Sequence, residues 1–179
     1  MQAPDLKQNY FELFGFTPAF DLDTRTLQSE QRRLQSIYHP DRHVDADERA
    51  RLLSVQMAAR VNEAYETLRD PVKRSRYLLE ISGAEMADES TTTSDTAFLM
   101  EQIELREALD SCRHADNGLE RCDEIETQLV RRADELANNF VALFERGDLE
   151  AAQEASRKMQ FLQRIHQQLS ELRFELEDF

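Results

Sequence analysis

The chain has 179 residues, which is enough for one ordinary domain or two small ones. Its 22 Lys and Arg residues and 36 Asp and Glu residues give a formal net charge of −14, which argues against a nucleic-acid partner or an anionic membrane surface. No apolar run reaches the roughly 18 residues of a membrane span, and residues 1–5 lack the features of a signal peptide. Cys112 and Cys122 make no disulfide framework, so we expect a cytoplasmic protein with reduced thiols.

The four glycines and four prolines separate segments that are rich in Leu, Ala, Glu, Gln and Arg. These residue types favour helices, and alternating runs of β-branched residues are absent. We therefore expect an all-α fold.

Two helices are predicted before residue 39. A capping box at 9–12 begins a short helix that ends at Gly15. Asp23 is placed to cap a second helix. The apolar residues of this second helix, at spacings of seven and four, are Leu27, Leu34 and Tyr38.

Two more helices follow a polar loop. The third helix is predicted to start near Asp47. Its apolar face, at steps of three or four, consists of Leu53, Met57, Val61, Ala64, Tyr65 and Leu68. Asp70 and Pro71 end this helix and begin a fourth, short helix that runs to Gly83.

The second half is predicted to form three longer helices at about 95–113, 118–145 and 148–177, packed like an antiparallel coiled coil. The apolar stripe of the middle helix is Leu119, Cys122, Ile125, Leu129, Ala133, Leu136, Phe140 and Leu143. That of the last helix is Leu149, Ala152, Ala155, Met159, Leu162, Ile165, Leu169, Leu172, Leu176 and Phe179. The segment 146–148 spells Arg-Gly-Asp, which we interpret as a glycine helix stop and an aspartate cap rather than as an adhesion motif.

Composition changes between the two halves. Residues 84–94 carry polar residues and no aromatic side chain, so we interpret residues 83–94 as a linker between a domain at 1–82 and a domain at 95–179. Residues 1–80 hold 12 basic and 13 acidic residues, a net charge of −1, whereas residues 81–179 hold 10 and 23, a net charge of −13. Such an asymmetry predicts different partners for the two halves.

The segment His39-Pro40-Asp41 lies in the loop between the second and third helices. In an enzyme, His39 and Asp41 would form an acid–base pair, but side chains that flank a proline do not easily converge on one atom. In a metal site they would join His43 and Asp45, yet four ligands in one loop without supporting hydrogen bonds are a weak signal. We therefore expect neither an enzyme nor a bound metal or cofactor.

Three segments, at 10–15, 38–42 and 61–74, resemble in order and spacing the J-domain of DnaJ-type co-chaperones. In the second half, residues 95–107 and the ending 177–179 are similar to the HscB family, the co-chaperones of iron–sulfur cluster assembly. The resemblance covers nearly the whole chain. It implies an N-terminal J-domain, a helical hairpin with two short flanking helices, and a C-terminal three-helix bundle.

The resemblance also implies a chaperone-binding site. A J-domain docks on a 70-kDa heat-shock chaperone, here of the HscA type, and triggers its ATP hydrolysis. The residues that match this role are His39, Pro40, Asp41, Arg42, Arg25, Arg32 and Arg33. Pro40 stiffens the loop, which lowers the entropy lost on docking, and the arginines would steer the helix toward an acidic surface. The arginines also fit an ordinary solvated helix surface, and Arg42 stands where many J-domains have Lys.

The second domain of the family binds IscU, the scaffold on which iron–sulfur clusters are built. The residues that match this scaffold-binding surface are Leu99, Met100, Ile103, Glu104, Glu107 and Phe161. We expect the apolar members, including a Phe161 that projects away from the helix seam, to be exposed and rimmed by carboxylates. Alternatively, they pack on the first domain or widen the core stripe.

Three other functions are open. A general J-domain co-chaperone would deliver unfolded clients to a DnaK-type chaperone, but the Gly/Phe-rich linker and the cysteine-rich zinc domain typical of such proteins are absent from the sequence. A helical adapter would carry the His-Pro-Asp segment by accident. An enzyme would use His39 directly. Cys112 and Cys122 are expected to be buried thiols, and His114 and His166 are expected on the surface.

Overall fold

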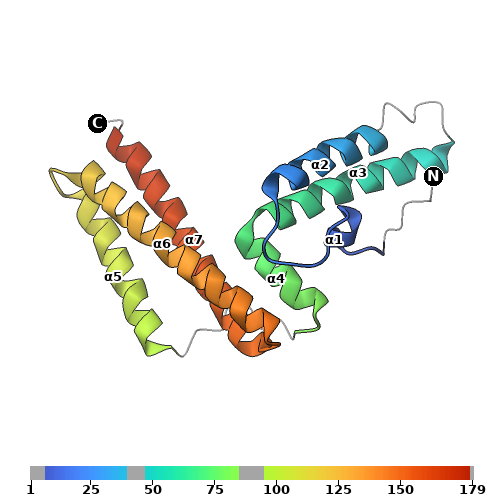
Figure 1. Cartoon of the computed structure of the whole chain (residues 1–179). Helices are drawn as coiled ribbons and strands as arrows, with labels where there is room; N and C mark the ends of the chain where they lie inside the picture. The colour runs from blue at the N-terminus through green and yellow to red at the C-terminus, as the bar shows by residue number, and fades with distance from the viewer. Residues whose placement is uncertain (1–6, 40–46, 85–94, 178–179) are drawn as a thin grey trace. The chain divides into compact units, whose positions relative to one another are not determined.

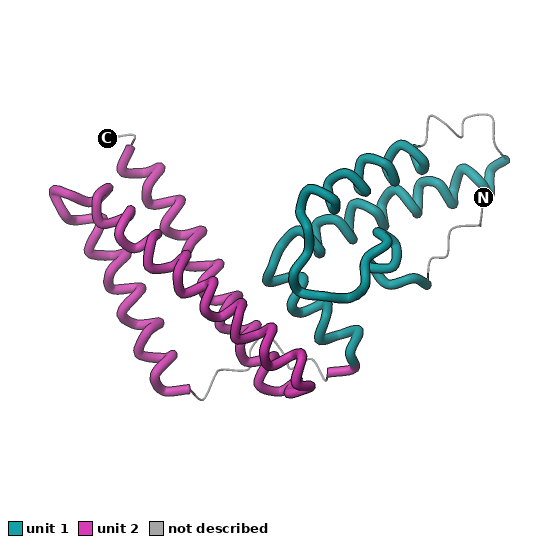
Figure 2. Tube along the Cα trace, in the orientation of Figure 1, with its two compact units in different colours: residues 1–82 teal, residues 83–179 magenta. Residues whose placement is uncertain are grey.

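The computed structural model describes residues 7–39, 47–84 and 95–177, which form helices and contain no strand (Figure 1). The chain divides into two compact units, Met1–Ser82 and Gly83–Phe179 (Figure 2). The all-α fold predicted from the sequence is confirmed. None of the helices in the described part of the chain has the length and apolar character that a membrane-spanning helix needs.

Unit 1 contains α1 (Tyr10–Leu13), α2 (Thr24–Tyr38), α3 (Glu48–Arg69) and α4 (Pro71–Ile81). Helices α2 and α3 lie side by side as an antiparallel hairpin, and α1 and α4 pack against α3 (Figure 1). The core between these helices is formed by Phe11, Leu27, Leu34, Met57, Val61, Ala64, Leu68, Leu78 and Leu79. Burial of these apolar side chains is the main term that stabilises the hairpin.

The helices of unit 1 begin where the sequence offers a cap. Asn9 and Glu12 form a complete capping box at the start of α1. The carboxylates of Asp23, Asp47 and Asp70 accept hydrogen bonds from the first free backbone amides of α2, α3 and α4. The predicted starts of these helices are therefore correct.

Unit 2 contains α5 (Thr96–Arg113), α6 (Gly118–Glu145) and α7 (Leu149–Glu177). Helices α6 and α7 form a long antiparallel pair, and α5 packs against both (Figure 1). Most of the predicted stripes of α6 and α7 are buried, but Leu119 is 41% exposed and that part of the prediction is wrong. The α5–α6 turn buries Gly118 against Cys112, so the next residue, about 100° further round the helix, faces outward. Phe179 lies outside the described residues.

Candidate functional site

The C-terminal end of α2 forms the described part of the first candidate site. His39 is the exposed C-cap of α2 and, with Arg32, Gln35 and Ser36, lines a shallow depression on the surface. Gln35 ties this end of α2 to α3, because its Nε2 donates to Oδ1 of Asn62 at 2.9 Å. The predicted site residues Pro40, Asp41 and Arg42 lie outside the described residues, as do His43 and Asp45.

The three predicted arginines of α2 are all exposed. Arg25 lies in the first turn, where its backbone amide donates to the Asp23 carboxylate at 3.0 Å. The Nε of Arg33 lies 2.7 Å from Oε2 of Glu30, three residues earlier on the same helix. An exposed pair of this kind contributes at most about 1 kcal/mol, so a partner carboxylate can replace Glu30 at small cost.

One buried arginine and one half-buried arginine support the hairpin, and the sequence pattern does not indicate where they lie. The guanidinium of Arg74 donates to the carbonyl oxygen of Leu68 and lies 4.9 Å from the ring centre of Phe20. Burial lowers the pKa of Arg74. The guanidinium of Arg60 lies 5.2 Å from the ring centre of Tyr10. Both guanidinium groups contact aromatic rings in the segment before α2, and they join this segment to α3 and α4. These contacts therefore help to fix the start of α2, the helix that leads to His39.

The second candidate site lies on α5. We define the α5 surface as Leu99, Met100, Ile103, Glu104 and Glu107. Met100 and Ile103 are 53% and 47% exposed, Leu99 is half-buried, and both glutamates are exposed. The surface therefore combines apolar side chains that solvent reaches with carboxylates beside them, a combination typical of protein-binding sites.

The prediction that Phe161 projects into solvent is wrong. Its side chain is only 5% exposed, and its ring packs edge-on against Phe98 with centroids 5.5 Å apart. The guanidinium of Arg106 lies 5.5 Å from the ring centre of Phe161. Helical spacing placed Phe161 off the α6–α7 seam correctly, but it did not reveal that α5 covers that side of α7.

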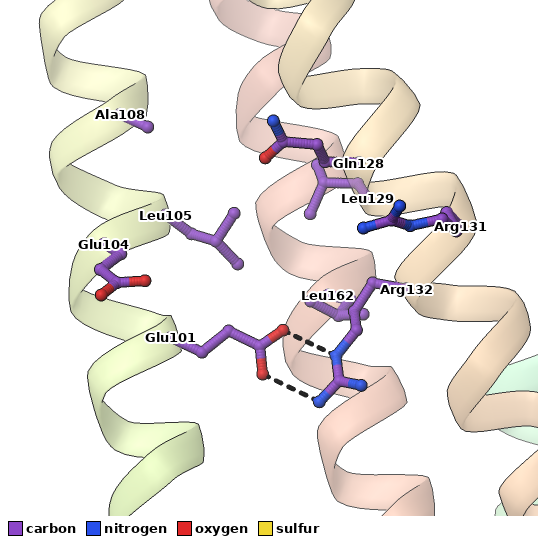
Figure 3. Close-up of a pocket in the computed structure, with 9 residues that line it drawn as sticks. All are labelled: Glu101, Glu104, Leu105, Ala108, Gln128, Leu129, Arg131, Arg132 and Leu162. Atoms are coloured by element: carbon purple, nitrogen blue, oxygen red, sulfur yellow. Dashed lines mark hydrogen bonds and ion pairs between the residues drawn. The ribbon is translucent and has the colours of Figure 1, made fainter.

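Two ion pairs fasten the N-terminal half of α5 to the rest of unit 2, and a third, exposed pair joins Arg113 near the end of α5 to Glu175 of α7. Asp95, the N-cap of α5, accepts a hydrogen bond from the amide of Phe98 at 3.1 Å and forms an ion pair with Lys158 on α7. These contacts hold the pKa of Asp95 below its usual range. In the other pair, Arg132 on α6 donates to both carboxylate oxygens of Glu101, at 2.7 and 3.1 Å (Figure 3). The bond to Glu101 raises the pKa of Arg132.

Between α5 and α6, beside the second ion pair, lies a cavity of about 350 Å³. Leu105 points into it from α5, and Leu129 faces it from α6 (Figure 3). Leu162 of α7 also contributes to its lining. Glu104 of the α5 surface lies at its edge (Figure 3).

Cys112 and Cys122 are fully buried free thiols, as predicted. Burial and the neighbouring Cys112 raise the pKa of Cys122 to about 11, so it remains a protonated thiol at neutral pH. Within the described residues, no group of three or more His, Cys, Asp or Glu side chains is arranged to hold a metal ion. His114 and His166 are exposed, as predicted.

Comparison with known proteins finds two family models. Residues 9–77 match the DnaJ domain, and residues 94–170 match the HSCB C-terminal oligomerisation domain. A Co-chaperone protein HscB homolog from Shewanella sp. (strain ANA-3) is 40% identical over 92% of this chain and 96% of its own length. Among solved structures, chaperone HscB from Vibrio cholerae is 36% identical, covers 94% of this chain and 99% of its own, and superposes with a TM-score of 0.85. Human co-chaperone HscB is 31% identical, with coverages of 95% and 84% and a TM-score of 0.86.

Proposed function

Because the chain belongs to the HscB family of J-domain co-chaperones, we propose that it binds the iron–sulfur scaffold IscU and stimulates ATP hydrolysis by an HscA-type 70-kDa heat-shock chaperone. A J-domain co-chaperone acts on a 70-kDa heat-shock chaperone and is not the catalyst itself. The chain would act as an adapter, because one unit engages the chaperone while the other holds the scaffold. Joining the two partners in this way raises their effective concentration and aids cluster transfer.

In this proposal unit 1 engages the chaperone. His39, Pro40 and Asp41 form the triggering loop, followed by Arg42. The exposed side chains of Arg25, Arg32 and Arg33 support this role, since they place positive charge along the helix that leads to the loop. Such charge speeds encounter with an acidic partner surface and helps to fix its orientation.

Unit 2 holds the scaffold in this proposal. The observation that carries it is the α5 surface, where Met100 and Ile103 are about half exposed beside Glu104 and Glu107. Exposed apolar anchors supply binding energy, and the flanking carboxylates select a basic partner. Phe161, which we expected to contact the scaffold, is buried and would instead support α5 from beneath.

The proposal is tested by steady-state ATP hydrolysis of an HscA-type chaperone with this protein, IscU, or both. We expect stimulation by both together to exceed the sum of the separate effects. His39→Gln should abolish stimulation and leave IscU binding, measured by calorimetry, unchanged. His114→Gln is the matched control, because this exposed histidine lies in unit 2, and it should behave as the wild type.

Other outcomes would contradict the proposal. Stimulation that does not depend on IscU would indicate a general J-domain co-chaperone that serves a DnaK-type chaperone. If His39→Gln abolished IscU binding and left stimulation intact, the assignment of the two units would be wrong.

A further inference from the structure

We infer that two ion pairs, Asp95–Lys158 and Glu101–Arg132, act as positioning residues that fix the rotation of α5 and so present the α5 surface to the scaffold. This inference rests on the proposed function. We call the two pairs the α5 braces. They lie outside the α5 surface, and none of their four residues belongs to the predicted site.

The brace to α7 acts at the start of α5. The Asp95 carboxylate both caps the helix and binds Lys158, whose side chain is only 16% exposed. The Lys158 ammonium also lies 5.2 Å from the ring centre of Phe98. One lysine therefore holds the cap and the first buried aromatic ring of α5 together, next to Leu99 and Met100.

The brace to α6 acts at Glu101, about 1.7 turns after Asp95. Glu101 lies directly after Met100, and its carboxylate receives two parallel hydrogen bonds from Arg132 (Figure 3). A two-pronged bond restricts both distance and angle, which a single contact does not. Arg132 is itself held by Glu135, whose Oε2 accepts from Nη1 at 3.1 Å. The Arg132 side chain is therefore held in position by its own helix as well as by its bond to Glu101.

Core packing does little to fix the rotation of α5 about its own axis, so the ion pairs have a large share in setting it. Only Phe98, Leu109 and Cys112 are buried among its 18 residues, whereas α7 buries ten of 29. Successive residues on a helix are about 100° apart, so a modest rotation would carry Met100 or Ile103 out of the presented face. Because one brace pulls toward α7 and the other toward α6, together they resist rotation in both senses.

Scaffold affinity in a double-mutant cycle tests the inference. Glu101→Gln and Arg132→Gln should each raise the dissociation constant for IscU about three- to tenfold, and the double variant should be no worse than either. Arg132→Lys, which keeps the charge but loses the two-pronged geometry, should fall between the wild type and Arg132→Gln. Arg131→Gln is the matched control, because it removes the same charge from a side chain that is 80% exposed and lies 3.8 Å from Glu135, and it should not weaken binding.

The sign of the Arg132→Gln effect separates positioning from simple charge. This change makes unit 2 more negative, so charge alone would strengthen binding to a basic scaffold, whereas a loose α5 would weaken it. Stronger or unchanged binding would therefore overturn the inference. So would additive effects in the cycle, or a lower melting temperature with unchanged affinity at 25 °C, since a merely structural pair would behave in that way.

Amide hydrogen exchange of the free protein gives a readout that does not depend on the scaffold. In Glu101→Gln and in Lys158→Met, we expect the amides of α5 to exchange several-fold faster while those in the middle of α6 are unchanged. Unchanged exchange in α5 would overturn the inference on its own. If the wild type did not bind IscU, the proposed function would fail, and the exchange result would still decide whether the braces hold α5.

Discussion

Tyr77 of α4 holds the first turn of α1 through a single hydroxyl group. Its oxygen accepts a hydrogen bond from the backbone amide of Tyr10 at 2.9 Å, and the two rings stack with centroids 4.5 Å apart. Tyr77→Phe keeps the stack but leaves that amide without its partner. We expect the free energy of unfolding of unit 1 to fall by about 1 kcal/mol, measured by urea denaturation. Tyr65→Phe, at a half-buried position on α3, should change it by less than about 0.5 kcal/mol.

Asp95 links the stability of unit 2 to pH. Lys158 and the amide of Phe98 stabilise its carboxylate and lower its pKa in the folded state, so its contribution is complete above the unfolded-state pKa of about 3.9. That contribution is lost as pH falls through the lower folded-state pKa. Asp95→Asn can still cap α5 but cannot form the ion pair. Denaturation between pH 7 and pH 2.5 should show a stability difference from the wild type that shrinks below pH 4, and a constant difference would contradict this assignment.

At the scale of helices, the turn between α5 and α6 has room only for a glycine at position 118. A Cβ added to Gly118 would lie 2.5 Å from the carbonyl oxygen of Cys112 and 3.1 Å from Cδ1 of Leu176. Gly118→Ala must therefore push α5 away from α6, and we expect a loss of about 1–3 kcal/mol in the free energy of unfolding. Asn117→Ala is the control: the Asn117 side chain makes no capping hydrogen bond to the first turn, so its loss should have little effect. Equal effects of the two changes would show that crowding at the corner is not the cause.

Helix boundaries could be predicted from the sequence because their causes are local. Asp23, Asp47, Asp70 and Asp95 each bond to amides two or three residues later, and such a pattern is visible in the chain itself. The burial of Phe161 was missed because it depends on Phe98, 63 positions earlier. Periodicity indicates which side chains share a face of one helix, but not which neighbouring helix covers that face.

The same limit applies to the candidate sites. The apolar and acidic members of the α5 surface could be identified from the sequence. Helical periodicity assigns the core positions of α5, and these residues lie outside that stripe. The α5 braces could not, since their partners lie 31 and 63 residues apart. The buried Arg74 also gives no signal in the sequence, because a charged residue in a short helix is normally expected in solvent.

At the scale of the whole molecule, the proposed adapter requires both activities in one chain. His39→Gln should retain scaffold binding, and a Met100→Ser, Ile103→Ser double variant should retain chaperone stimulation. A mixture of the two should not regain the synergy of the wild type, because neither molecule brings both partners together. The measurement is steady-state ATP hydrolysis with IscU present, and full recovery in the mixture would show that the connection between the units is not needed.

The division of charge makes the proposed scaffold interface of unit 2 sensitive to salt. Residues 81–179 carry a net charge of −13, while residues 1–80 carry −1. Binding of a basic scaffold to unit 2 should weaken steadily between 50 and 500 mM salt, because exposed charges are increasingly screened. Calorimetry across this range would test it. An affinity that did not change with salt would mean that the apolar anchors act without the carboxylates.

The complete burial of Cys112 and Cys122 makes the protein convenient to label. Maleimide reagents react with the thiolate of an accessible cysteine, and neither native thiol is accessible in the folded chain. A single cysteine placed at an exposed position such as Gln28 or Gln167 should therefore be modified selectively without removal of the native pair. Since the chain has no tryptophan whose own fluorescence could report partner binding, dyes attached in this way would supply that signal.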